Sequence, residues 1–167
     1  MKLTGTVPSR TDSFYETKGR LWKLFLFISS LTGKAMTFLW SRDLQTALLI
    51  SLGAVLGANL RYWFCVWAGQ RWGTQYPFAT MIINLAGSLI LGFFVTVITE
   101  RFMIDPRWRV FFAIGFLGSY TTFSTYTYES ITLLMQGNWS LGIFNLLGSA
   151  ILGGLAAVLG IVLGRWV

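Results

Sequence analysis

Four apolar segments, each long enough to cross a bilayer, constrain this chain more than any other feature. They run over about Leu44–Ala68, Phe78–Thr99, Trp108–Met135 and Leu141–Gly164. A helix needs roughly 20 apolar residues to cross the hydrocarbon core. A helix also satisfies its own backbone hydrogen bonds, which lipid cannot do. The sequence therefore predicts an all-α membrane protein with four transmembrane helices.

Composition supports the same class and excludes several functions. Hydrophobic residues make up 54% of the 167 positions and charged residues 11%, against roughly 25% charged in soluble domains. With no His and one Cys, the chain has no internal disulfide and lacks the residues for a His/Cys metal site or Cys–His catalysis. We expect no enzyme. The net charge is +7, and the Lys and Arg residues collect at the ends of apolar spans. That placement fits membrane topology better than nucleic-acid binding.

Residues 1–42 form an N-terminal extension, and residues 43–167 form the four-helix unit. Residues 1–20 are polar and basic, so we expect no stable structure there. Residues 21–40 carry apolar side chains at helical spacing, interrupted by Lys23 and Lys34. That pattern favours an amphipathic helix lying at the membrane surface.

The third span contains an unusually polar stretch, Gly115–Glu129. Four hydroxyl residues fall within five positions, and glycines precede them: Gly115, Gly118, Thr121, Thr122, Ser124 and Thr125. Irregular polar backbone survives at this depth only inside protein or beside a wet cavity. The hydroxyls could bond to carbonyls freed by any break in the helix. The stretch is read either as an ion pathway or as a seam where hydroxyls hold helices together.

Spans two and four share a repeat. Asn84–Gly92 matches Asn145–Gly153 at seven of nine positions. Asn, Gly and Ser at i, i+3 and i+4 lie on one helical face, where small residues permit close packing. The asparagine amides, and the serines Ser88 and Ser149, are expected to contact other helices.

Two ionisable residues lie within the spans. A centrally placed Arg costs roughly 2.5–3.5 kcal/mol on insertion scales, so Arg61 either snorkels to the interface or has a role inside the protein. Glu129 lies towards the end of the third span.

These segments together resemble the Fluc (CrcB) fluoride channels, from Leu48 to Gly164. The resemblance rests on Gly-Ala-Asn-Leu-Arg61-Tyr, Asn84-Leu-Ala-Gly-Ser, Gly115-Phe-Leu-Gly-Ser-Tyr-Thr-Thr-Phe-Ser-Thr-Tyr and Asn145-Leu-Leu-Gly-Ser, in that order. It implies an antiparallel dimer of four-helix subunits with a broken third helix, two narrow fluoride pores and a central structural Na⁺.

The resemblance also assigns residues. The implied pore-lining residues are Asn84, Phe123, Ser124, Thr125, Tyr126 and Ser149. Glu129 and Arg61 correspond to vestibule or mouth positions, and the backbone carbonyls of Gly118 and Thr121 to the Na⁺ ligands. Tyr126 departs from the family, which has a second pore Phe, and the added hydroxyl puts the selectivity or throughput of a pore in question. Amide and hydroxyl donors and ring edges suit a small hydrated anion that must also be released.

The distribution of positive charge bears on orientation. Eleven of the thirteen Lys and Arg residues fall on the side that holds both termini, and only Arg71 lies opposite. We therefore expect cytoplasmic termini in the cell membrane, and a dimer either with itself or with an oppositely oriented homologue. Two alternatives remain open: a small dual-topology proton-coupled transporter that uses Glu129, and a non-conducting partner subunit.

Overall fold

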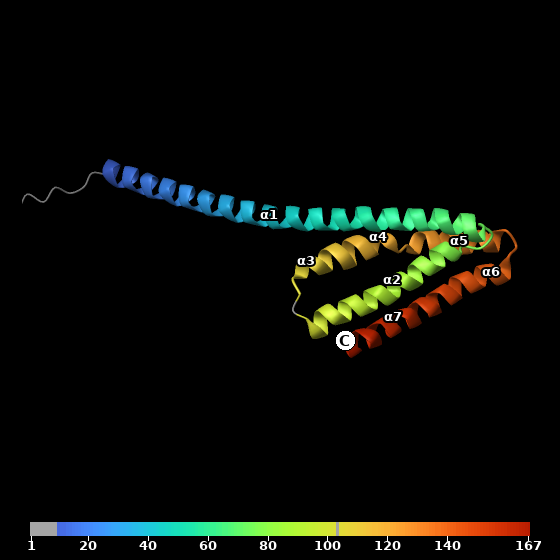
Figure 1. Ribbon diagram of the computed structural model, residues 1–167. Coiled ribbons are helices and arrows are strands. Elements are labelled where there is room, and N and C mark those ends of the chain that lie inside the picture. Colours follow the sequence, from blue (N-terminus) through green and yellow to red (C-terminus); the bar gives the residue numbers. More distant parts are fainter. Residues whose placement is uncertain (1–9, 103) are drawn as a thin grey trace, which may run out of the picture. The chain divides into compact units, whose positions relative to one another are not determined.

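The computed structural model describes residues 10–102 and 104–167, which are helical apart from short connections and contain no strand. The first half consists of α1 (Arg10–Trp72), α2 (Phe78–Thr96) and its π-helical continuation η1 (Val97–Arg101). There follow α3 (Pro106–Trp108), the π-helical η2 (Arg109–Leu117), α4 (Gly118–Tyr120) and α5 (Phe123–Met135). The chain ends with α6 (Trp139–Ile143), η3 (Phe144–Gly148) and α7 (Ser149–Trp166) (Figure 1).

Three helices of the described residues are long and apolar enough to cross a membrane: Ser41–Trp72, Phe78–Arg101 and Trp139–Trp166. The third predicted span is divided among η2, α4 and α5, each shorter than a bilayer crossing requires. The all-α membrane class is therefore confirmed, while the count of four spans stays a prediction.

The chain separates into two compact units, which divide between Gln45 and Thr46. In the first unit, the expectation that residues 1–20 lack regular structure is wrong for residues 10–20, because α1 already begins at Arg10. Extending an existing helix is far less costly than nucleating one. The helix of the apolar stretch that follows can therefore extend through the polar residues 10–20. Residues 1–9 lie outside the described part of the chain.

In the second unit, α2 and α7 lie side by side (Figure 1). Glycine makes the contact possible: a Cβ on Gly92 would collide with the carbonyl oxygen of Ala157, and one on Gly160 with that of Leu89. α1 approaches η2 in the same way, since a Cβ on Gly115 would come within 2.7 Å of the Ile50 carbonyl oxygen. Close backbone approach of this kind is how membrane helices associate.

A buried apolar cluster joins α2, η2 and α4. Ile83, Leu117 and Tyr120 form its centre. The rings of Phe116 and Tyr120 stack with centroids 6.1 Å apart. This cluster holds α2 against η2 and α4, and so determines where the chain emerges after Tyr120.

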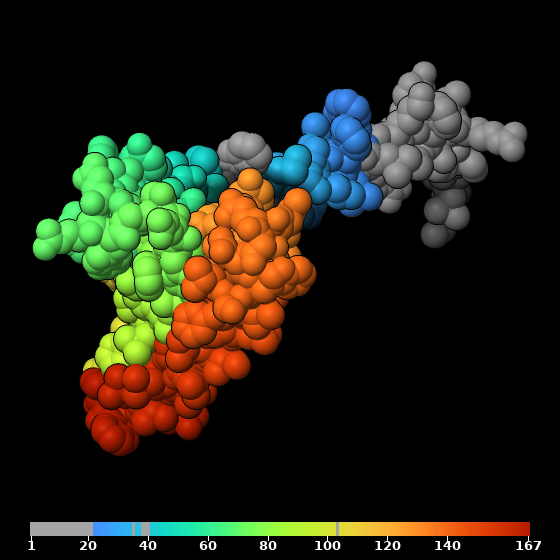
Figure 2. Space-filling model, turned by 90° about the vertical axis from the view of Figure 1, so that its right-hand side faces the viewer, coloured from blue at the N-terminus to red at the C-terminus, as the bar shows by residue number. Residues whose placement is uncertain are grey.

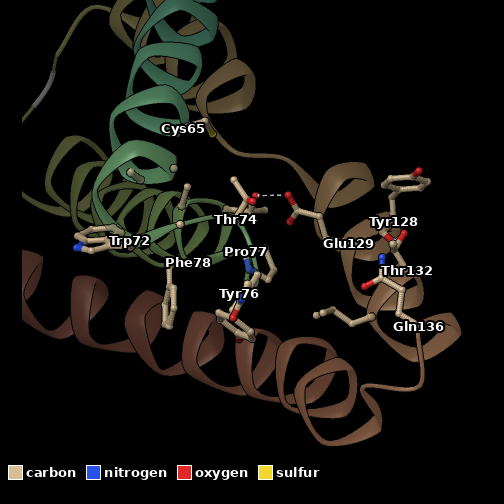
Figure 3. Close-up of a pocket in the computed structure, with 17 residues that line it drawn as sticks. Cys65, Trp72, Thr74, Tyr76, Pro77, Phe78, Tyr128, Glu129, Thr132 and Gln136 are labelled. Atoms are coloured by element: carbon tan, nitrogen blue, oxygen red, sulfur yellow. Dashed lines mark hydrogen bonds between the residues drawn. The ribbon is translucent and has the colours of Figure 1, made fainter.

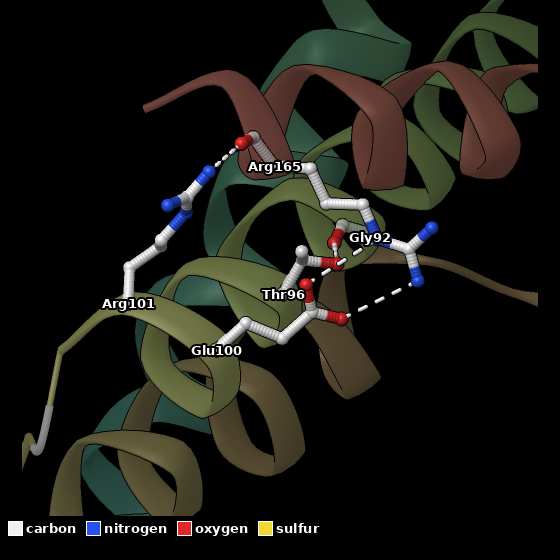
Figure 4. A network of polar contacts seen from close by, with 5 residues as sticks. All are labelled: Gly92, Thr96, Glu100, Arg101 and Arg165. Atoms are coloured by element: carbon white, nitrogen blue, oxygen red, sulfur yellow. Dashed lines mark hydrogen bonds and ion pairs between the residues drawn. The ribbon is translucent and has the colours of Figure 1, made fainter.

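The ends of η1 and α7 are joined by exposed polar contacts (Figure 4). The Nε atom of Arg165 lies 3.3 Å from Oε2 of Glu100, and the Arg101 guanidinium donates to the carbonyl oxygen of Arg165. An Arg at the C-terminus of a helix satisfies carbonyls that lack an intrahelical partner. Exposed pairs contribute about 0–1 kcal/mol each, so these contacts orient the helix ends more than they stabilise the fold.

Candidate functional site

The helix of the third apolar segment is interrupted at Thr121 and Thr122. Both residues have extended backbones, with φ/ψ of −83°/159° and −151°/119°. The last helical bond before the interruption runs from the Thr121 amide to the Leu117 carbonyl, at 3.0 Å. α5 then starts with an N-cap, because Thr122 Oγ1 accepts from the Thr125 amide at 3.2 Å.

Asn84, on α2, satisfies the backbone at this interruption. Its Nδ2 donates to the Thr122 carbonyl at 3.0 Å, and its Oδ1 accepts from the Thr122 amide at 2.9 Å. One side chain thus replaces both hydrogen bonds that Thr122 would make in a helix, which apolar surroundings demand. The Thr122 amide is then no longer available to the carbonyl of Gly118, four residues earlier.

A groove of about 520 Å³ opens beside the interruption. Six of the residues assigned by resemblance line it: Asn84, Gly118, Thr121, Phe123, Tyr126 and Ser149. They come from α2, α4, α5 and α7, and Thr121 lies in the connection between α4 and α5. The structure therefore brings together the asparagine, the aromatic pair, one serine and the two Na⁺ positions of the sequence prediction.

The two aromatic residues of the groove have different surroundings. Phe123 is 78% exposed, whereas Tyr126 is 9% exposed, with ring centroids 5.8 Å apart. The Tyr126 hydroxyl donates to the carbonyl oxygen of Leu146 in η3. The hydroxyl that distinguishes Tyr126 from the expected Phe is thus engaged with the backbone rather than left free in the groove.

Ser124 and Thr125 do not line this groove. Both are exposed and cluster with Thr122, whose Oγ1 lies 3.0 Å from Thr125 Oγ1 and 3.3 Å from Ser124 Oγ. Their hydroxyls gather at the first turn of α5, next to Phe123.

Glu129 faces a second cavity, of about 280 Å³, at the end of α1 and the start of α2 (Figure 3). Its Oε1 accepts from Thr80 Oγ1 at 2.9 Å, while its Oε2 is buried without a hydrogen-bond partner among the described residues. In Figure 2 this green end of α1 and start of α2 lies beside the orange residues of α5 and α6. Arg61 lies on α1 and lines neither cavity.

A buried polar network lies between α5 and η3. Asn145 is 1% exposed and Ser130 is fully buried. Asn145 Nδ2 donates to Ser130 Oγ at 2.8 Å, and its Oδ1 accepts from the Tyr76 hydroxyl at 3.2 Å. Burial raises the pKa of Tyr76, which favours the protonated phenol that donates this bond.

Residue patterns alone did not identify several of these contacts. Thr80, Tyr76, Ser130 and the Leu146 carbonyl each pair with a residue far away in the sequence. The one available signal was an asparagine amide in an apolar helix, since such an amide must find partners. That signal indicates a partner without identifying it.

Comparison with known proteins gives a consistent result. The family model described as "CrcB-like protein, Camphor Resistance (CrcB)" matches residues 48–161. A protein of Chloroflexus aurantiacus named "Fluoride-specific ion channel FluC" is 46% identical over 123 residues, covering 74% of this chain and 98% of the relative. A protein of the same name from Koribacter versatilis is 49% identical over 113 residues, covering 68% and 89%. "Fluoride-specific ion channel FluC 1" of Listeria innocua is 42% identical over 118 residues, covering 70% and 95%.

Proposed function

Because this chain belongs to the CrcB-like family, we propose that it is a fluoride channel through which F⁻ leaves the cell passively. The observation that carries the proposal is the groove beside Thr121 and Thr122. It combines Asn84, Phe123 and Ser149, which offer an amide, a ring edge and a hydroxyl to an anion.

These groups fit the needs of a small anion. Asn84 uses one N–H on the Thr122 carbonyl, and an amide nitrogen carries a second N–H. A ring edge is weakly positive, so the exposed Phe123 attracts an anion without trapping it. Conduction requires binding that is strong enough to replace water and weak enough to release the ion.

The structural Na⁺ belongs to the proposal as well. The Thr122 amide is held by Asn84, which leaves the Gly118 carbonyl without its i+4 donor, and Thr121 is extended. Hard cations prefer oxygen ligands, and an interrupted helix presents carbonyl oxygens. The donor set therefore fits Na⁺, which would hold the two halves of the third segment together by neutralising its carbonyl dipoles.

A dimer follows from the same groove in this proposal. Phe123 is 78% exposed beside it, so a second subunit would complete the wall and form two pores in an antiparallel pair. The excess of Lys and Arg on the side of the termini supports cytoplasmic termini, and the second subunit is either another copy of this chain or an oppositely oriented homologue.

Efflux from liposomes that contain only this chain tests the function, with an ion-selective electrode comparing F⁻ and Cl⁻. We expect F⁻ to leave rapidly while Cl⁻ is retained, at a rate independent of pH. No F⁻ efflux would favour the non-conducting subunit. A pH-dependent flux abolished by Glu129→Gln would favour the proton-coupled transporter, since Glu129 lines the second cavity.

Orientation needs a separate measurement. A cysteine added after Val167, in a Cys65→Ala background, is labelled by impermeant thiol reagents. Labelling from the cytoplasmic side alone supports pairing with an oppositely oriented homologue. Labelling from both sides would establish a dual-topology homodimer.

A further inference from the structure

The second asparagine of the repeat, Asn145, does not line the groove. It lies in η3, 1% exposed, one helical turn before Ser149, which does line it. A fully buried amide that contacts no solvent acts through the groups it binds.

The Asn145 amide nitrogen is hydrogen-bonded to α5. Nδ2 donates to Ser130 Oγ at 2.8 Å, and Ser130 Oγ donates in turn to the Tyr126 carbonyl at 2.8 Å. Both distances are typical of well-formed hydrogen bonds. Asn145 thus contacts α5 at Ser130, about two turns beyond its first residue, Phe123.

The amide oxygen of Asn145 is shared. Oδ1 accepts from the Tyr76 hydroxyl at 3.2 Å and from Ser149 Oγ at 3.4 Å. The Ser149 bond is the longest in the network, so its hydroxyl is oriented by Asn145 but only weakly retained. The Ser149 hydroxyl can therefore turn from Asn145 and donate a hydrogen bond to an incoming anion at small cost, since long hydrogen bonds are weak.

We propose that Asn145 is a positioning residue of the channel: it holds the Ser149 hydroxyl at the edge of the groove through a weak bond that an anion can displace, and it anchors α5 beside the groove at Ser130. The proposal rests on the proposed function, because Ser149 has a role only if an anion passes through the groove. Asn84 then fixes the start of α5 at Thr122, and Asn145 fixes the same helix two turns later, at Ser130.

The test compares initial F⁻ efflux rates of reconstituted full-length variants. Asn145→Leu keeps the approximate volume and removes every hydrogen bond of the amide, so we expect efflux to slow by about tenfold. Asn59→Leu is the matched control, because the Asn59 amide is exposed and, among the described residues, bonds within α1 to Val55. Its efflux should equal that of the wild type within about twofold.

A double-mutant cycle with Ser149→Ala separates positioning from general destabilisation. If Asn145 acts through Ser149, Asn145→Leu slows the Ser149→Ala channel by much less than it slows the wild type. Equal slowing in both backgrounds overturns the proposal, as does an Asn145→Leu rate equal to that of Asn59→Leu.

If Asn145→Leu does not elute like the wild type in size exclusion, Ser130→Ala replaces it in the same cycle. Ser130 and Ser149 both bond to Asn145, so coupling between them reports on that amide, and additive effects overturn the proposal. A wild-type protein that does not pass F⁻ refutes the proposed function instead, whereas a conducting wild type with an additive cycle refutes this inference alone.

Discussion

The two copies of the repeat have nearly the same sequence but contact different kinds of partner. Asn84 is half-buried and binds the backbone of Thr122 at the helix interruption. Asn145 is fully buried and binds the side chains of Tyr76 and Ser130. The same amide serves as a substitute for backbone pairing in one place and as the centre of a side-chain network in the other.

The glycines of the two copies differ in the same way. A Cβ on Gly87 would collide with Thr121 Cγ2, and one on Gly92 with the Ala157 carbonyl oxygen. In the second copy, a Cβ on Gly148 would lie 3.4 Å from the Phe144 ring, and one on Gly153 would lie 3.8 Å from Ser88 Oγ. The first copy therefore depends on close packing, while the second would accommodate a Cβ at ordinary contact distances.

The largest effect is expected at the first asparagine. Asn84→Asp removes the donor to the Thr122 carbonyl and places a negative charge in an anion path. We expect F⁻ efflux to fall by roughly a hundredfold, or about 3 kcal/mol. The ion-selective electrode measures it, with an unchanged size-exclusion profile as the control. Normal efflux would place the pathway away from this groove.

A pair of glycine substitutions tests the packing difference. Gly92→Ala forces α2 away from the Ala157 carbonyl oxygen, so we expect the free energy of unfolding to fall by about 1–3 kcal/mol. Gly153→Ala, the equivalent change in the second copy, should stay within about 0.5 kcal/mol of the wild type. Thermal unfolding in detergent compares the two. Similar midpoints for both variants would show that the copies pack alike.

Substitutions in the aromatic pair compare Phe123, which is exposed beside the groove, with Tyr126, whose hydroxyl bonds to the second copy. Phe123→Ile replaces an exposed ring edge with an apolar chain, and we expect efflux to slow by about tenfold. Tyr126→Phe removes the bond to the Leu146 carbonyl, which should lower the free energy of unfolding by about 1 kcal/mol. Its efflux should change less than that of Phe123→Ile. The reverse order in efflux would mean that the Tyr126 hydroxyl meets the ion.

The smallest effect is expected outside both copies. Deleting residues 1–42 removes a segment that precedes the family match at residue 48, so efflux should stay within about twofold of the wild type. Loss of flux from a truncated chain that still elutes normally would give the extension a part in conduction.

The membrane class could be predicted from the sequence, while the site residues assigned by resemblance stay a prediction. Apolar run length depends on composition alone, and lipid leaves few structures available to such a run. The hydroxyl-rich stretch also contains the interruption at Thr121 and Thr122, because polar groups concentrated at that depth need internal partners. The structure of residues 10–20 was predicted wrongly, since their helix depends on the neighbour that they extend.

Only the tertiary structure decided how each residue of the repeat is used. Asn84 and Asn145 have almost identical neighbours in sequence, yet one meets a broken helix and the other a tyrosine 69 residues away. Tyr126 turns its hydroxyl to Leu146, a partner that no local pattern specifies. Local sequence determines which polar groups must be satisfied, because burial in lipid penalises each one. The packing of distant helices determines what satisfies them.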